Sequence, residues 1–182
     1  MQNRLDLIIG PVCSGKSAEL IRRVERFRIA DYKVLVIKPE IDTRAVSVKS
    51  RTGTEVSCVS LNDLTEVLSY ANLYDVIAID EAQFFKDLYS VVKFLLKDMK
   101  KRVLVSGLDA DFNGQIFGEV SQLVSLASSV DRLTAICMVC KNDDAIFSQK
   151  LKKGGDQIEI GDLEIYQPRC INCFIPGGLE KI

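Results

Sequence analysis

The sequence predicts an α/β protein in which helices cover both faces of a parallel β-sheet, followed by a small cysteine-bearing module. Short apolar runs alternate with amphipathic helical segments through the first three quarters of the chain. The apolar runs are continuous, as is typical of strands that are buried on both faces. From about residue 137 this alternation stops, and two pairs of closely spaced cysteines follow. We therefore expect one α/β unit with a structurally different C-terminal part.

The individual elements follow from hydrophobic periodicity. We expect five strands, at residues 5–9, 34–37, 76–79, 102–108 and 133–137. Helices are expected over 17–30 and 88–99, where apolar residues recur every three or four positions. Ser60 and Asp63 resemble a capping box before a further helical segment, and the polar residues 40–55 are expected to form a loop.

The length of 182 residues fits one main domain with an appendage. We expect an α/β domain over residues 1–136, a second, small module over 137–175 and a flexible tail over 176–182. Within the module, the loop over residues 141–169 could not fold on its own apolar content.

The composition excludes several classes of function. The chain has no histidine, so Ser-His-Asp triads, Cys-His proteases and histidine-based zinc enzymes are ruled out. The net charge of −1 argues against an extended nucleic-acid surface. No apolar run approaches the length of a membrane span. Six cysteines without a secretion-signal pattern lead us to expect a reducing, cytoplasmic compartment.

A phosphate-binding loop is the clearest motif. The pattern GxxxxGK[ST] is matched by consecutive residues at the end of the first expected strand: Gly10, Pro11, Val12, Cys13, Ser14, Gly15, Lys16 and Ser17. In this pattern backbone N–H groups surround phosphate oxygens, Lys16 reaches the β- and γ-phosphates, and the Ser17 hydroxyl binds Mg²⁺. The alternative is a chance glycine-rich turn, which the strand–turn–helix context disfavours. The Cys13 side chain is expected to fill space as a small apolar group, without a chemical role.

An acidic pair, Asp80 and Glu81, directly follows the third expected strand. A carboxylate at that edge, beside a phosphate loop, is typical of the Mg²⁺ position in phosphoryl-transfer sites, so Asp80 is the expected second magnesium ligand. Glu81 is then a candidate base or water-orienting group. The alternative is an acidic pair that only stabilises a helix N-terminus.

Two CxxC pairs, Cys137 with Cys140 and Cys170 with Cys173, predict a structural zinc site with four thiolate ligands. The 29 residues between the pairs exceed the usual spacing of about 15–20. Four reduced core cysteines and a redox-active pair are the alternatives.

The chain resembles the type II thymidine kinase family, the small cytosolic kind, over residues 4–175. The resemblance is carried by Asp80-Glu81-Ala82-Gln83-Phe84-Phe85, by Gly107-Leu108-Asp109 and by Tyr166 four residues before Cys170. Further landmarks are Glu19-Leu20 after the phosphate loop, Lys38-Pro39, Asp42-Thr43-Arg44, Phe112 and Phe117-Gly118.

The resemblance implies a P-loop NTPase fold of the RecA-like kind, with a small zinc-ribbon-like domain whose loop covers the substrate. It implies transfer of the γ-phosphate of ATP to the 5′-hydroxyl of thymidine or deoxyuridine, for pyrimidine deoxynucleoside salvage. It also implies a homotetramer inhibited by thymidine triphosphate. Glu81 matches the catalytic base and Arg44 an arginine near the transferred phosphoryl group.

The remaining site residues are also implied by the resemblance. The phosphate loop, Asp80 and Gln83 match ATP-binding positions. The positions that match the nucleoside site are Phe84, Leu108, Phe112, Ser148, Gln157, Ile158, Glu159, Ile160, Gly161 and Tyr166.

The chain departs from the family pattern at a few positions. Val12 and Cys13 replace the usual Met and Phe, Ala18 replaces Thr, and Cys173 stands where many bacterial relatives carry His. Other readings are a different P-loop enzyme, such as a nucleoside monophosphate kinase or a deoxycytidine-preferring kinase, and an ATP-driven nucleic-acid-binding protein. A guanine-nucleotide switch is disfavoured because the sequence has no NKxD motif.

Overall fold

Six parallel strands form the central sheet of the computed structural model, which describes residues 2–42, 47–49, 53, 55–152 and 164–178. The strand order is β5-β2-β6-β7-β1-β8, and every neighbouring pair is parallel. The bounds are β1 Leu5–Ile9, β2 Val34–Pro39, β5 Val59–Leu61, β6 Val76–Ile79, β7 Arg102–Gly107 and β8 Ser129–Arg132. The predicted α/β class is confirmed.

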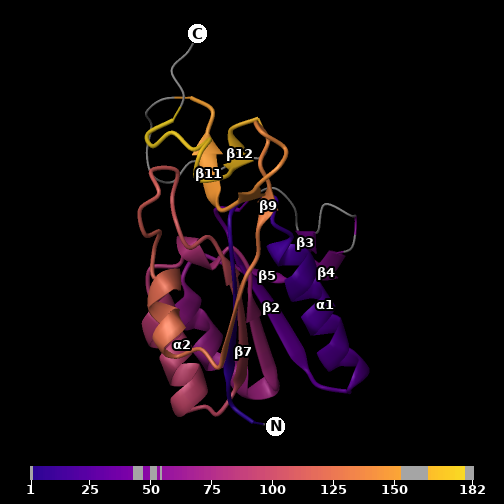
Figure 1. Ribbon diagram of the computed structural model, residues 1–182. Helices are drawn as coiled ribbons and strands as arrows, with labels where there is room; N and C mark the ends of the chain where they lie inside the picture. The colour runs from indigo at the N-terminus through magenta and orange to yellow at the C-terminus, as the bar shows by residue number, and fades with distance from the viewer. Residues whose placement is uncertain (1, 43–46, 50–52, 54, 153–163, 179–182) are drawn as a thin grey trace.

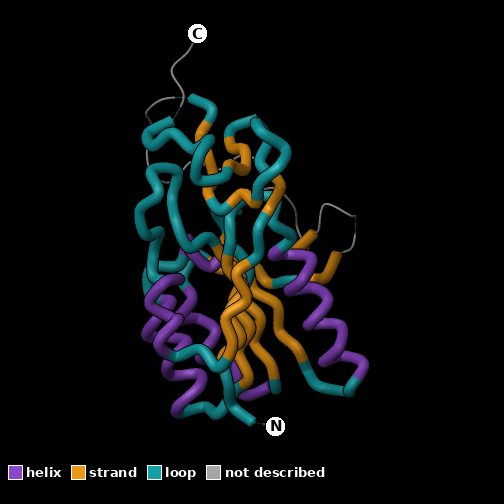
Figure 2. The backbone as a smooth tube through the Cα atoms, in the orientation of Figure 1, coloured by secondary structure: helices purple, strands orange, loops and turns teal. Residues whose placement is uncertain are grey.

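Helices cover both faces of the sheet (Figures 1 and 2). The long helices are α1 Lys16–Ile29 and α2 Leu88–Lys97, and the short 3₁₀ helices are η1 Leu64–Ser69, η2 Ala71–Leu73, η3 Ala82–Phe84 and η4 Val120–Ser125. Successive strand residues serve opposite layers: Leu7 packs in the layer of α2, and Ile8 in the layer of α1. Because both sides of each central strand are buried, its sequence is a continuous apolar run.

The edge of the sheet differs from the prediction. The fifth strand was expected at residues 133–137, but β8 occupies Ser129–Arg132 and pairs with β1. Its alternating partly buried and exposed residues are typical of an edge strand, so it lacks the continuous apolar run used to find strands. The opposite edge strand, β5, was not expected, for the same reason.

Two smaller predictions were also wrong. The expected loop over 40–55 contains strand β3 Ser47–Lys49 and the first residue of strand β4 Glu55–Ser57. These two strands pair as an antiparallel hairpin. Ser60 lies within β5, so there is no capping box; Asp63 alone caps η1, with its carboxylate accepting a hydrogen bond of 2.8 Å from the Thr65 N–H.

Four short strands lie beyond the carboxyl ends of the sheet strands, at the top of Figure 1. They are β9 Ala135–Ile136, β10 Asp144–Ala145, β11 Phe147–Lys150 and β12 Tyr166–Arg169. Strand β9 pairs with β10 and β11 with β12, both antiparallel. We call these strands and the four cysteines next to them the cysteine module. Within the described ranges, no helix is both long and apolar enough to cross a membrane.

Candidate active site

The phosphate loop connects β1 to α1 at the carboxyl end of the sheet. Gly10 and Gly15 have φ values of 145° and 87°, which favour glycine, and Cys13 also adopts a left-handed conformation with φ of 64°. A Cβ atom at Gly10 would lie 2.2 Å from the Leu133 carbonyl oxygen, so any side chain there would collide with the backbone. The sequence pattern therefore has the strand, turn and helix that phosphate binding requires.

The Lys16 ammonium group lies within this loop, where its Nζ donates a hydrogen bond of 2.7 Å to the Pro11 carbonyl. Burial lowers the pKa of Lys16, while the negative charges of Glu81, Asp80 and Asp109 oppose that shift. These carboxylates follow the neighbouring strands β6 and β7, so Lys16 lies in a negative electrostatic environment.

Asp80 lies at the end of β6 with only 5% of its surface exposed. Burial and the adjacent Glu81 raise the pKa of Asp80 to about 6, and the nearby hydroxyls of Ser106 and Ser17 oppose this rise. The Asp80 carboxylate and the Ser17 hydroxyl offer the hard oxygen ligands that Mg²⁺ prefers, and these are the two residues at which the ion is expected from the sequence.

Glu81 follows in a left-handed conformation, with φ of 49°. Gln83 holds its carboxylate: the amide Nε2 donates a hydrogen bond of 2.6 Å to Glu81 Oε2. The other end of the same amide accepts a hydrogen bond of 3.0 Å from the Leu108 N–H. Gln83 is buried, and it therefore links the expected base to the segment after β7.

Two glycines make room for Gln83. A Cβ atom at Gly107 would lie 2.9 Å from Gln83 Oε1, and one at Gly118 would lie 2.6 Å from its backbone oxygen. The family resemblance implies that Gln83 is an ATP-binding residue, whereas in the structure its amide group is hydrogen-bonded to Glu81 and Leu108.

Sequence reasoning missed two polar residues of this region. Asp109 follows β7 as Asp80 follows β6, and it forms an ion pair of 3.1 Å with Arg132. The rule that found Asp80, a carboxylate after a buried strand, could have found Asp109 too. Ser106 is fully buried, and its Oγ makes no hydrogen bond of normal geometry with any residue that the structure describes.

Three of the residues that are expected to bind the nucleoside, Phe84, Phe112 and Tyr166, are aromatic. Phe84 meets Phe117 edge to face, with ring centroids 5.8 Å apart. The ammonium group of Lys150 lies 4.7 Å from the centre of the Phe112 ring. Tyr166 is the strand partner of Lys150 in the β11–β12 pair, so Phe112 is joined to the cysteine module through Lys150.

Ser148 is also buried in β11, where its hydroxyl contacts the phosphate loop. Its Oγ accepts a hydrogen bond of 3.0 Å from the Val12 N–H. The remaining predicted site residues, Arg44 and residues 157–161 (Gln157, Ile158, Glu159, Ile160 and Gly161), lie outside the described part of the chain.

The four cysteines of the two CxxC motifs lie close together, as predicted. All are reduced, and their sulfur atoms lie within 4.8 Å of one another. Cys140 Sγ and Cys170 Sγ are 3.8 Å apart, about the sulfur–sulfur separation that follows from tetrahedral Zn–S bonds of about 2.3 Å. The cluster could therefore bind a structural metal.

The electrostatics of the cluster also suit a cation. Burial alone would raise the pKa of Cys137, but backbone N–H groups of Cys170, Cys140 and Val139 outweigh it and lower that pKa to about 6. Hydrogen bonding with Cys170, burial and the other sulfurs raise the pKa of Cys173 to about 12. Four thiolates cannot ionise together without an opposing charge, which a divalent metal supplies.

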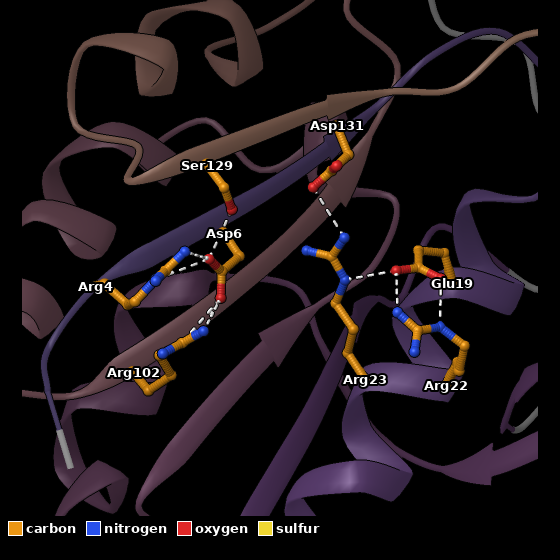
Figure 3. Close-up of polar contacts among 8 residues, drawn as sticks. All are labelled: Arg4, Asp6, Glu19, Arg22, Arg23, Arg102, Ser129 and Asp131. Atoms are coloured by element: carbon orange, nitrogen blue, oxygen red, sulfur yellow. Dashed lines mark hydrogen bonds and ion pairs between the residues drawn. The ribbon is translucent and has the colours of Figure 1, made fainter.

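A second polar region extends from the amino ends of β1, β7 and β8 to α1 (Figure 3). There Asp6 accepts hydrogen bonds from Arg4, Arg102 and Ser129. Arg23 bridges Glu19 at 2.7 Å and Asp131 at 2.9 Å. Apart from Glu19, these residues border a hollow of about 430 Å³. Because the arginines in Figure 3 are each paired with a carboxylate, we assign this region to holding the sheet and α1 together.

Three comparisons with known proteins show what this chain is similar to. The sequence profile of the family described as thymidine kinase matches residues 3–174. A thymidine kinase from Mycoplasma mobile is 37% identical over 182 residues, which cover 98% of this chain and 90% of that protein. A crystal structure of a DNA replication initiation factor aligns with a TM-score of 0.43 and 11% identity, over 71% of this chain and 40% of that one.

Proposed function

This chain belongs to the thymidine kinase family, and on that premise we propose that it transfers the γ-phosphate of ATP to the 5′-hydroxyl of thymidine. Deoxyuridine is proposed as a second acceptor, and salvage of pyrimidine deoxynucleosides for DNA synthesis as the role. The observation that carries the proposal is the phosphate loop Gly10–Ser17 between β1 and α1, in which Lys16 donates a hydrogen bond to the Pro11 carbonyl, together with the buried carboxylate of Asp80 at the end of β6.

The phosphate loop binds the triphosphate in this proposal. Backbone N–H groups of residues 10–17 and the N-terminus of α1 provide positive potential, and Lys16 exchanges its contact with Pro11 for phosphate oxygens. Asp80 and Ser17 would hold Mg²⁺, which neutralises developing charge on the phosphates when bound. These groups position the γ-phosphate and lower the electrostatic cost of its transfer.

Glu81 is the proposed general base, which accepts the proton of the 5′-hydroxyl as the hydroxyl oxygen attacks the γ-phosphorus. The bond between that phosphorus and the β,γ-bridging oxygen breaks, and ADP leaves. A carboxylate suits this task in a chain without histidine. Gln83 holds the Glu81 carboxylate from the side, so we assign Gln83 to positioning the base. This differs from the ATP contact expected from the family resemblance.

The nucleoside site rests on the resemblance together with the aromatic contacts. Phe84, Leu108, Phe112 and Tyr166 are proposed to surround the base, and residues 157–161 to cover it. Flat apolar rings offer stacking surfaces for a pyrimidine. Arg44 is proposed to act on the transferred phosphoryl group.

The cysteine module is proposed to bind Zn²⁺ through Cys137, Cys140, Cys170 and Cys173, as a structural ion. Two observations support this assignment. The four sulfur atoms lie within 4.8 Å of one another. The neighbouring sulfur atoms also raise the pKa of Cys173, and a divalent cation would offset that repulsion between thiolates. From the family resemblance alone, we propose a cytoplasmic homotetramer that is inhibited by thymidine triphosphate.

The test is transfer of labelled γ-phosphate from ATP to a panel of acceptors: thymidine, deoxyuridine, deoxycytidine and thymidine monophosphate. We expect product from thymidine and deoxyuridine, and none from any acceptor with Lys16→Ala. Phosphorylation of deoxycytidine alone, or of the monophosphate alone, would replace the proposal with one of the two rival P-loop kinases. Failure with every acceptor would contradict a nucleoside kinase.

A further inference from the structure

The phosphate loop and the cysteine module touch at two adjacent loop residues. Ser148 of β11 accepts a hydrogen bond from the Val12 N–H, and Cys13 packs against the apolar cluster formed by Ala135, Ala145 and the module's cysteines. The hydrogen bond between Val12 and Ser148 joins residues that are 136 positions apart in sequence. The module therefore rests directly on the loop.

The Pro11–Val12 peptide is held at both ends. Its N–H group donates to Ser148, while its carbonyl oxygen accepts 2.9 Å and 2.7 Å hydrogen bonds from Ser14 Oγ and Lys16 Nζ. A planar trans peptide directs its N–H and C=O groups in opposite directions. The hydroxyl that fixes the N–H therefore also fixes the direction of the carbonyl that receives Lys16.

Ser148 itself has little freedom to move. It is 5% exposed, and it stands opposite Pro168 in the β11–β12 pair. That pair is tied to both cysteine pairs, because Pro168 accepts a hydrogen bond from the Met138 N–H and Arg169 directly precedes Cys170. Phe147, beside Ser148, stacks on Phe174 with centroids 4.2 Å apart. The hydroxyl is thus presented to the loop from a fixed support.

We propose that Ser148 is a positioning residue of the phosphate loop, which acts from the cysteine module by fixing the Pro11–Val12 peptide and thereby the placement of Lys16. The inference rests on the proposed function, because it takes the loop to bind the triphosphate of ATP. It assigns Ser148 a role different from the nucleoside contact that the family resemblance implies. Affinity for Mg·ATP then depends on a hydroxyl outside the loop.

The test compares Ser148→Thr with Ser148→Val by titration calorimetry with Mg·ATP in the absence of nucleoside. The two replacements have nearly the same shape and both suit a strand, but only threonine keeps the hydroxyl. We expect Ser148→Thr to bind Mg·ATP as the unchanged protein does. Ser148→Val is expected to bind about 3- to 10-fold more weakly, the effect of one lost hydrogen bond.

Ser129→Ala is the matched control, because it also removes a serine hydroxyl bound to a protein partner, Asp6, but at the opposite end of the sheet. It should leave Mg·ATP affinity unchanged. Equal Mg·ATP affinity for the threonine and valine variants, whether normal or reduced, would overturn the inference. A change confined to the KM for thymidine would instead assign Ser148 to the nucleoside site.

The failure of this inference is distinguishable from that of the proposed function. If the unchanged protein does not bind Mg·ATP, the proposed function fails first. If it binds Mg·ATP and phosphorylates thymidine while the valine variant binds ATP normally, only the role of Ser148 is lost.

Discussion

At the scale of single residues, the candidate site depends on how one carboxylate is held. Glu81 has a left-handed backbone, which is uncommon for a residue with a side chain and concentrates at functional sites. Gln83 fixes its carboxylate and connects it to Leu108. Two predictions separate the chemistry of Glu81 from its positioning.

Replacing Glu81 with Gln removes the base and keeps the side-chain shape. We expect kcat to fall by about 100-fold or more, with Mg·ATP affinity retained, because a general base acts in the transition state. Steady-state kinetics and calorimetry check this. A kcat equal to that of the unchanged protein would remove Glu81 from the mechanism.

Replacing Gln83 with Met removes both amide hydrogen bonds at similar length. We expect kcat to fall by about 10-fold, because the base is less precisely placed, while Mg·ATP affinity changes by less than about twofold. The exposed Gln122→Met is the control and should behave as the unchanged protein does. Weaker ATP binding at normal kcat would return Gln83 to the ATP contacts.

At the scale of elements, β1, β7 and β8 are joined at their amino ends by Asp6 (Figure 3). Burial alone would raise the pKa of Asp6, but hydrogen bonds from Ser129, Arg102 and Arg4 lower it overall. A lowered pKa in the folded protein means that ionised Asp6 stabilises the fold above its ordinary pKa of 3.8. That stabilisation is lost as the pH falls through the lowered pKa.

We expect Asp6→Asn to lower the free energy of unfolding by about 2 kcal/mol at pH 7, because it leaves partly buried donors without their anion. The deficit should shrink below about pH 4 as Asp6 of the unchanged protein becomes protonated. Urea unfolding at several pH values measures both effects. Asp131→Asn, at a more exposed ion pair, should cost less than about 1 kcal/mol. A pH-independent deficit for Asp6→Asn would contradict the electrostatic explanation.

The predictions from sequence succeeded where local pattern and burial agree. Strands β1, β6 and β7 were predicted to within one residue of their bounds, because a strand that is buried on both faces is a continuous apolar run that can be recognised in a single sequence. Strands β5 and β8 were missed or misplaced, because edge strands are short and half exposed.

The same distinction applies to the site. The phosphate loop and the cysteine pairs are local motifs, whereas the contacts of Gln83 with Leu108 and of Ser148 with Val12 join distant segments. Only the folded chain shows such pairs.

At the scale of the whole molecule, the cysteine module lies beyond the carboxyl ends of the sheet strands (Figure 1). Through Ser148 of β11 it contacts the phosphate loop. Its apolar cluster consists of two alanines, the four paired cysteines and Cys13. Among the described residues of the module, so small a cluster provides little hydrophobic stabilisation, and a bound metal would stabilise the module further.

We expect Cys170→Ser to abolish binding of one metal ion per chain, to lower the thermal unfolding temperature and to raise the KM for thymidine. Metal analysis, calorimetry and kinetics provide the three readouts. Cys58→Ser, at a half-buried cysteine outside the cluster, should keep the metal. Full metal content in the Cys170 variant would contradict a four-cysteine site.

The most direct test of the central claim is a crystal structure of this chain with Mg²⁺ and a non-hydrolysable ATP analogue. We expect the β- and γ-phosphates to lie within Gly10–Ser17, with Lys16 turned from Pro11 to the phosphate oxygens. Phosphates bound instead in the arginine-bordered hollow at the opposite end of the sheet, with the loop unchanged, would contradict it.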